Sequence, residues 1–142
     1  MKYWQILSWV SLLSATPASA LEKPLFERLG RNKGIEALSA RFISHLSKDA
    51  RLNDNPGIKT MKKEISELEA THRLASALNK ASGGPAKASR ADLLKGIKAE
   101  VELGAREWFY VIQDANQAMD EQMLAAKERK DLLALLLRAK DQ

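Results

Sequence analysis

The chain has 142 residues, with 23 lysines and arginines against 18 aspartates and glutamates and no cysteine. Without cysteine it cannot be a disulfide-stapled scaffold, a zinc–thiolate module, a thiol enzyme or a lipoprotein anchored through a cysteine. The formal net charge of +5 is small and mixed along the chain. Such a charge favours solubility over nucleic-acid binding, so we expect no nucleic-acid partner.

The first twenty residues have the order of a secretory signal peptide. Lys2 precedes an apolar stretch over residues 3–13, and three small residues end at Ala20. The stretch is far shorter than the roughly 20 residues that cross a bilayer, although an uncleaved anchor is the alternative. We expect cleavage after Ala20, a periplasmic or secreted location, and one domain over residues 21–142 without a transmembrane span.

The rest of the chain predicts helices and no sheet, because Leu, Ala, Lys and Glu dominate and apolar residues recur three and four positions apart. A short helix is expected around Leu25–Leu29 and a longer one over Gly34–Ser47. Asn, Asp, Pro and Gly residues crowd positions 53–57 and predict a turn. The next helix is expected as one piece over Lys59–Asn79. Its predicted apolar side carries Met61, Ile65, Leu68, Ala75 and Leu78, with His72 close by.

The second half of the chain predicts one loop and three further helices. Gly83-Gly84-Pro85 indicates the loop, because glycine allows positive φ and proline cannot donate a backbone hydrogen bond. A helix is expected to start at Ser89, which resembles an N-cap. The last two predicted helices should pair in a compact all-α domain of five or six helices. Their apolar positions are Trp108, Ile112, Ala115 and Met119 in one, and residues 132–137 in the other.

Four stretches carry a resemblance to a known family. They are residues 25–30 (LFERLG) followed by 35–42, residues 46–52, the Gly83-Gly84-Pro85 turn, and residues 109–120 with 128–136. In this order and spacing, the chain resembles the truncated haemoglobins of group one, in particular their exported members. The resemblance covers essentially all of residues 21–142, with a longer segment than usual between Pro56 and His72. It implies a truncated globin-like fold, in which two helices cross over two others.

The resemblance also implies where a haem site would lie. The family binds haem and a diatomic gas, oxygen, through a proximal histidine. That position falls on Ile97 when it is counted from the glycine-glycine-proline turn, and isoleucine cannot bind iron. The family's distal tyrosine, directly after Phe42, falls on Ile43, and its distal glutamine falls near Leu74. These departures predict a degenerate pocket that binds no haem.

Two functions of different kinds follow from this pattern. In the first, Phe42, Ile43, Leu74 and Ile97 fill the former haem space, and the domain binds a small apolar ligand or a protein partner. In the second, the chain still binds haem and oxygen from the distal side. The iron ligand and its propionate-binding neighbour would then be His72 and Arg73. A third alternative is an unrelated helical bundle.

The remaining polar residues do not indicate an enzyme. His45 lies among polar neighbours on the helix expected over Gly34–Ser47, which places it at the edge of a solvated face. The acidic residues alternate with lysines along the predicted helices, which is typical of a solvated surface. The sequence contains no Ser-His-Asp order, metal-ligand spacing or phosphate-binding loop. We therefore expect no catalytic residues.

Overall fold

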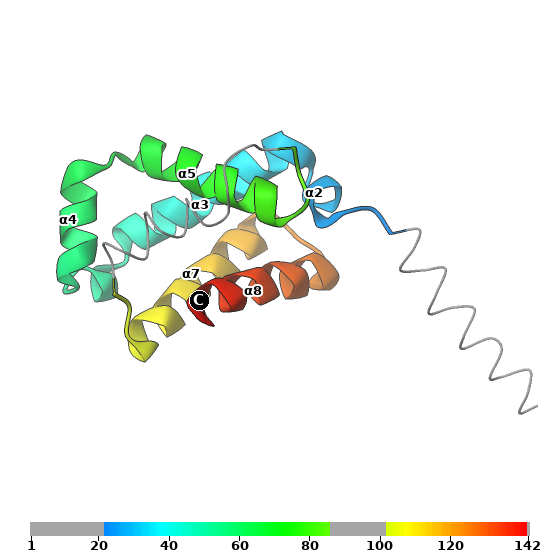
Figure 1. Ribbon diagram of the computed structural model, residues 1–142. Helices are drawn as coiled ribbons and strands as arrows, with labels where there is room; N and C mark the ends of the chain where they lie inside the picture. The colour runs from blue at the N-terminus through cyan, green and yellow to red at the C-terminus, as the bar shows by residue number, and fades with distance from the viewer. Residues whose placement is uncertain (1–21, 86–101, 142) are drawn as a thin grey trace, which may run out of the picture.

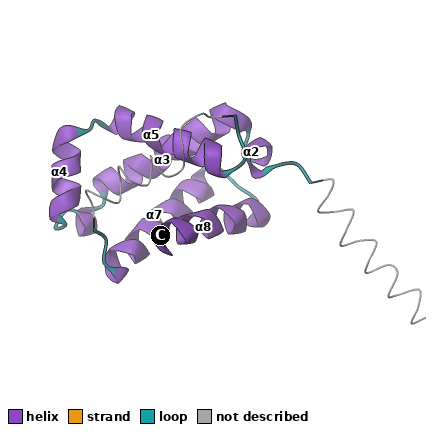
Figure 2. Cartoon of the chain, viewed as in Figure 1, coloured by secondary structure: helices purple, strands orange, loops and turns teal. Residues whose placement is uncertain are grey.

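The computed structural model describes residues 22–85 and 102–141, and every regular element in these two ranges is helical (Figure 2). The all-α prediction is confirmed for this part of the chain. The predicted signal peptide and the helix expected after Ser89 lie outside the described residues. The helices are α2 (Leu25–Arg28), α3 (Arg31–Lys48), the 3₁₀ turn η1 (Ala50–Leu52), α4 (Pro56–Glu64), α5 (Glu67–Ala81), α7 (Ala105–Glu121) and α8 (Ala126–Asp141).

The helices pack as two pairs that meet through α3 and α7. Helix α3 contacts both α5 and α7, and α8 lies beside α7, as predicted for the last two helices (Figure 1). Apolar residues recur three and four apart in the longer helices, so each of these buries one side in a common core. The described core consists of Leu29, Ile35, Leu38, Phe42, Leu52, Ile58, Ala75, Leu78, Val111, Ala115, Ala118, Met119 and Leu132.

The segment predicted as one helix over Lys59–Asn79 is two helices, and that prediction was wrong. Ile65 has φ −123° and ψ 127°, so it is extended and ends α4. Ser66 then caps α5, because its Oγ accepts a hydrogen bond from the backbone N–H of Glu69 at 3.1 Å. Leu68, expected on the apolar side, is instead 68% exposed. The break changes the direction of the chain between α4 and α5 (Figure 1).

Two glycines occupy positions that favour glycine for different reasons. A Cβ on Gly34, inside α3, would lie 1.8 Å from the backbone oxygen of Leu29, so only glycine allows α2 and α3 to approach this closely. Gly83 has φ +92°, in the region that glycine adopts without strain. The predicted loop after α5 is therefore confirmed at Gly83.

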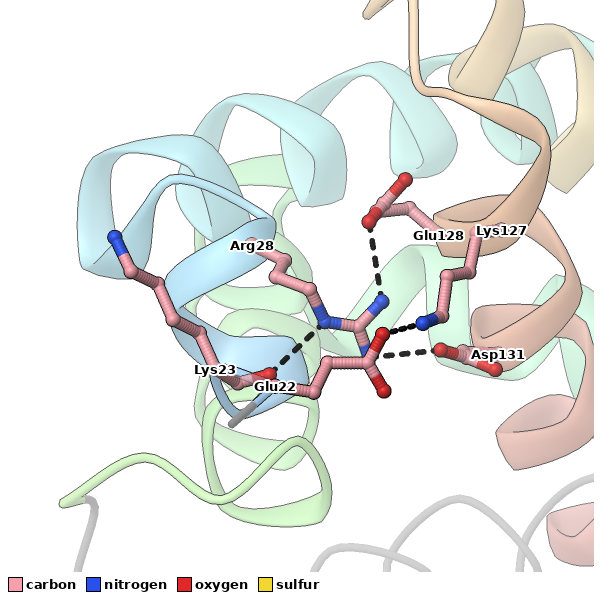
Figure 3. A network of polar contacts seen from close by, with 6 residues as sticks. All are labelled: Glu22, Lys23, Arg28, Lys127, Glu128 and Asp131. Atoms are coloured by element: carbon pink, nitrogen blue, oxygen red, sulfur yellow. Dashed lines mark hydrogen bonds and ion pairs between the residues drawn. The ribbon is translucent and has the colours of Figure 1, made fainter. Parts of the chain in front are cut away.

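Arg28 fastens the start of the described chain to the last helix (Figure 3). Its guanidinium donates hydrogen bonds to Glu128 at 3.1 Å and to Asp131 at 2.8 Å, and Nε donates to the carbonyl of Lys23 at 3.0 Å. The two carboxyls, first of all that of Asp131, raise the pKa of Arg28. Lys127 forms a further ion pair with Glu22. The three hydrogen bonds of Arg28 are called the Arg28 clasp below. They hold α2 against α8, although the two helices lie at opposite ends of the described chain.

Candidate functional site

Phe42, one of the predicted site residues, lies in the interior of the described fold. Its side chain is 7% exposed. The free space around it measures about 20 Å³, so it has room for about one water molecule. This space lies among Leu38, Phe42, Leu78, Ala115, Ala118, Met119, Leu132 and Leu136.

His72 lines a different cavity, on the outer surface. Its side chain is exposed on α5 and borders an open groove between α3 and α5, with a free volume of about 340 Å³. Helix α3 supplies Lys33, Glu36, Ala37 and Ala40 to this groove, and α5 supplies Leu68, Thr71, His72 and Ala75. The name α3–α5 groove is used below for this surface. Its small alanines and the exposed Leu68 make the groove mainly apolar, with charges at its rim.

The other predicted site residues are divided between core and surface. Leu74 is partly buried and packs against the core that contains Phe42, whereas Ile43 is partly exposed and stands outside that cluster. Arg73 donates from Nε to Glu69 Oε1 at 2.9 Å, and both side chains are about half exposed. Ile97 lies outside the described residues. The structure thus brings Phe42 and Leu74 to one core, but His72 borders a separate cavity.

Among the described residues, His72 has no hydrogen-bonding or ionic partner. Neither range of the described chain contains a group of three or more His, Asp or Glu side chains that could hold a metal ion. The groove therefore offers a single free imidazole beside apolar walls. Such a group can act as one axial ligand of a haem iron or as a hydrogen-bonding group for another ligand.

His45 has a structural contact instead. It is 22% exposed, and its Nε2 lies 2.5 Å from Glu121 Oε1. Arg41 also pairs with Glu121, at 3.2 Å, so these residues link α3 to the end of α7. Desolvation alone would raise the pKa of Glu121, but the hydrogen bonds from His45 and Arg41 lower it.

A buried acidic pair was missed by sequence reasoning. Asp114 of α7 is 5% exposed and lies near Asp49, the residue that follows α3. Burial, together with Asp49, raises the pKa of Asp114 to about 7. The hydrogen bonds from Arg51 lower the pKa of Asp49 to about 2, despite the opposing effect of burial. The sequence contains one indication that Asp114 is buried. It lies three residues after Val111 and directly before Ala115, on the side of the helix that carries apolar residues.

Comparisons with known proteins do not assign this chain to a family. No model of a protein family matches the sequence. No curated protein matches it either. Within the described residues, no helix is sufficiently long and apolar to span a membrane.

Proposed function

We propose that this chain is an exported, truncated globin-like domain that has lost its haem site and serves as a binding or interaction module. The resemblance over residues 25–52 and 109–136 supports the globin-like relationship. The packing of α3 and α5 on one side and α7 and α8 on the other supports it as well, since the family has two helices crossed over two (Figure 1). No catalytic residue and no cofactor belong to this proposal.

The observation that carries the loss of haem is the filled space around Phe42. A haem site needs a cavity of several hundred cubic ångströms, because pockets for molecules of this size measure roughly 300–1,000 Å³. The space that Phe42 borders has about 20 Å³ free. The small free space beside Phe42, Leu78 and Met119 supports a domain that holds no haem there.

The binding surface in this proposal is the α3–α5 groove. Ala37, Ala40 and Ala75 have short side chains, so a ligand or a helix can approach the backbone closely there. Leu68 adds an apolar group that is 68% exposed. A small apolar ligand or an apolar segment of a protein partner fits such a surface, because burying exposed apolar area supplies most of the free energy of association.

Binding can be measured with an apolar fluorescent probe, anilinonaphthalene sulfonate. We expect saturable binding by the chain from Leu21 onward and at least tenfold weaker binding by Ala40→Glu, which places a charge in the groove. Ala134→Glu is the matched control, since Ala134 is also exposed but lies on α8. Equal binding by both variants would mean that the probe binds elsewhere and would contradict the groove as the binding surface.

Haem binding through His72 is the second candidate, and the free imidazole in the groove favours it. Titration with hemin, followed at the Soret band, separates the two functions. The haem-free proposal expects no saturable complex. A stoichiometric complex that is lost in His72→Ala and kept in His45→Ala would establish haem binding instead.

The exported location is tested separately. Expression of the full chain in a bacterium and fractionation of the cells should yield a mature protein in the periplasm or medium. Its intact mass and N-terminal sequence should correspond to a start at Leu21. A protein that keeps Met1 and stays in the membrane fraction would support the uncleaved anchor.

A further inference from the structure

The contact between the turn after α3 and helix α7 contains a buried carboxyl group with an unpaired oxygen. The side chain of Asp114 is 7% exposed. Its Oδ2 has no hydrogen-bond partner within the described chain. Its Oδ1 lies 3.8 Å from Nη2 of Arg51, which is too far for a good hydrogen bond. If Asp114 were ionised, its buried negative charge would lack the hydrogen bonds and the close cation that stabilise a carboxylate.

Arg51 cannot fully stabilise a negative charge on Asp114, because its guanidinium already donates hydrogen bonds to Asp49. Its Nε and backbone N–H donate to Asp49 Oδ1 at 2.9 and 3.0 Å, and Nη2 donates to Oδ2 at 2.8 Å. The remaining nitrogen, Nη1, donates to Gln113 Oε1 at 2.7 Å. The guanidinium also lies over the ring of Tyr110, 4.2 Å from its centre. One cation thus faces two carboxyl groups.

We infer that Asp49 and Asp114 share a single proton across this contact, and that this proton makes the contact a pH-sensitive latch between the turn and α7. The proton resides on Asp114, because Asp49 has the hydrogen bonds that stabilise a carboxylate and Asp114 does not. When Asp114 ionises, two negative charges oppose each other beside one guanidinium. The repulsion weakens the attachment of residues 49–52 to α7.

The charged groups around the pair come from both sides of the contact. The turn contributes Asp49 and Arg51, and α7 contributes Asp114 itself and Tyr110, which lies under the guanidinium. Asn55, a few residues further on, donates through its amide to the carbonyl of Glu102 at 2.8 Å and to Glu107 Oε2 at 2.7 Å. This second attachment does not involve the acidic pair, so ionisation of Asp114 should loosen the turn and leave the start of α4 in place.

The direction of the pH effect follows from the two carboxyls. The pKa of Asp114 is raised from 3.8 to about 7 in the folded protein, so its contribution to stability is complete below pH 3.8 and is lost as the pH rises through 7. The pKa of Asp49 is lowered from 3.8 to about 2, so its contribution is present above pH 3.8 and is lost as the pH falls through 2. The pair therefore stabilises the fold most near pH 4.

Carboxyl ¹³C NMR of the purified protein tests the shared proton directly. We expect the Asp114 resonance to titrate between pH 6 and 8. In Asp49→Asn, Arg51 is released to pair with Asp114, and the Asp114 resonance should titrate at least one pH unit lower. An Asp114 resonance that titrates near pH 4 in the unmodified protein would overturn the inference, and so would an unchanged titration in Asp49→Asn.

The latch itself is tested by amide hydrogen exchange and urea unfolding at several pH values. Protection of residues 49–52, after correction for the intrinsic pH dependence, should fall between pH 5 and 8.5 by more than protection at Ile58, whose amide donates to Asn55 Oδ1 at the start of α4. Over the same pH range, the unfolding equilibrium constant should rise by about 10²-fold from this one group. Asp114→Asn should remove this rise, and Asp120→Asn, an exposed control on the same helix, should keep it. The opposite pattern would refute the latch.

Discussion

The clasp around Arg28 allows one prediction to be worked out in magnitude. Arg28→Met keeps much of the apolar stem and removes the hydrogen bonds to Lys23, Glu128 and Asp131. The Arg28 side chain is 17% exposed and that of Glu128 is 15% exposed, so these bonds are partly shielded from solvent. Exposed ion pairs contribute about 0.2–1 kcal/mol, and buried hydrogen bonds to charged groups contribute about 1.5–3 kcal/mol.

The contribution of each Arg28 hydrogen bond to the free energy of unfolding should lie between the values for exposed ion pairs and for buried charged hydrogen bonds. With about 1 kcal/mol for each carboxylate bond and about 0.5 kcal/mol for the carbonyl, the free energy of unfolding should fall by roughly 2–3 kcal/mol. For a domain of this size, the melting temperature should fall by roughly 8 °C. Arg28→Lys should recover less than half of the loss, because an ammonium cannot bond both carboxylates in the planar geometry of a guanidinium.

Urea unfolding followed by circular dichroism measures this loss. Arg31→Met is the matched control, since Arg31 is 72% exposed and lies 3.7 Å from its partner Glu27. The difference between the two variants should shrink in 1 M NaCl, because salt screens the ion pairs. Equal midpoints for Arg28→Met and Arg31→Met at low salt would refute the argument that the clasp stabilises the fold.

Two further predictions concern α3. Gly34→Ala should lower the free energy of unfolding by about 3 kcal/mol or more, because the new Cβ would meet the backbone oxygen of Leu29 at 1.8 Å and no rotamer relieves the clash. Thermal unfolding measures this, and a stabilised Gly34→Ala would show that α2 and α3 are further apart. Ser39→Ala should raise the free energy of unfolding by up to about 1 kcal/mol, because the buried Ser39 Oγ has no hydrogen-bond partner within the described chain. A loss of more than about 1 kcal/mol in urea would indicate a hydrogen bond at this hydroxyl.

Local sequence signals located most of the described helices correctly. Helices α3, α7 and α8 were predicted because their apolar residues repeat with the helical period. The break between α4 and α5 was missed because Ile65 fits the period of a continuous helix. The cap at Ser66 was visible as a serine followed three residues later by Glu69, yet it lies among charged residues that a helix also accepts.

The candidate site was predicted less completely than the helices. Counting along the chain assigned Phe42 and His72 to one pocket, whereas they border separate cavities. The exposure of Leu68 could not be predicted either, because the period places it with Ala75 and Leu78. Which side of α5 faces the core depends on the direction in which the chain leaves Ser66, and that direction is not encoded in the period.

The sequence by itself determined that the described part of this protein is helical and where its long helices run. Helix propensity and the spacing of apolar residues depend on neighbours within one or two turns, so they can be read without the fold. Only the tertiary structure decided that Arg28 reaches Asp131 and that Asp49 meets Asp114. Such polar contacts join residues far apart in the chain, and their energies depend on burial and distance, which packing alone sets.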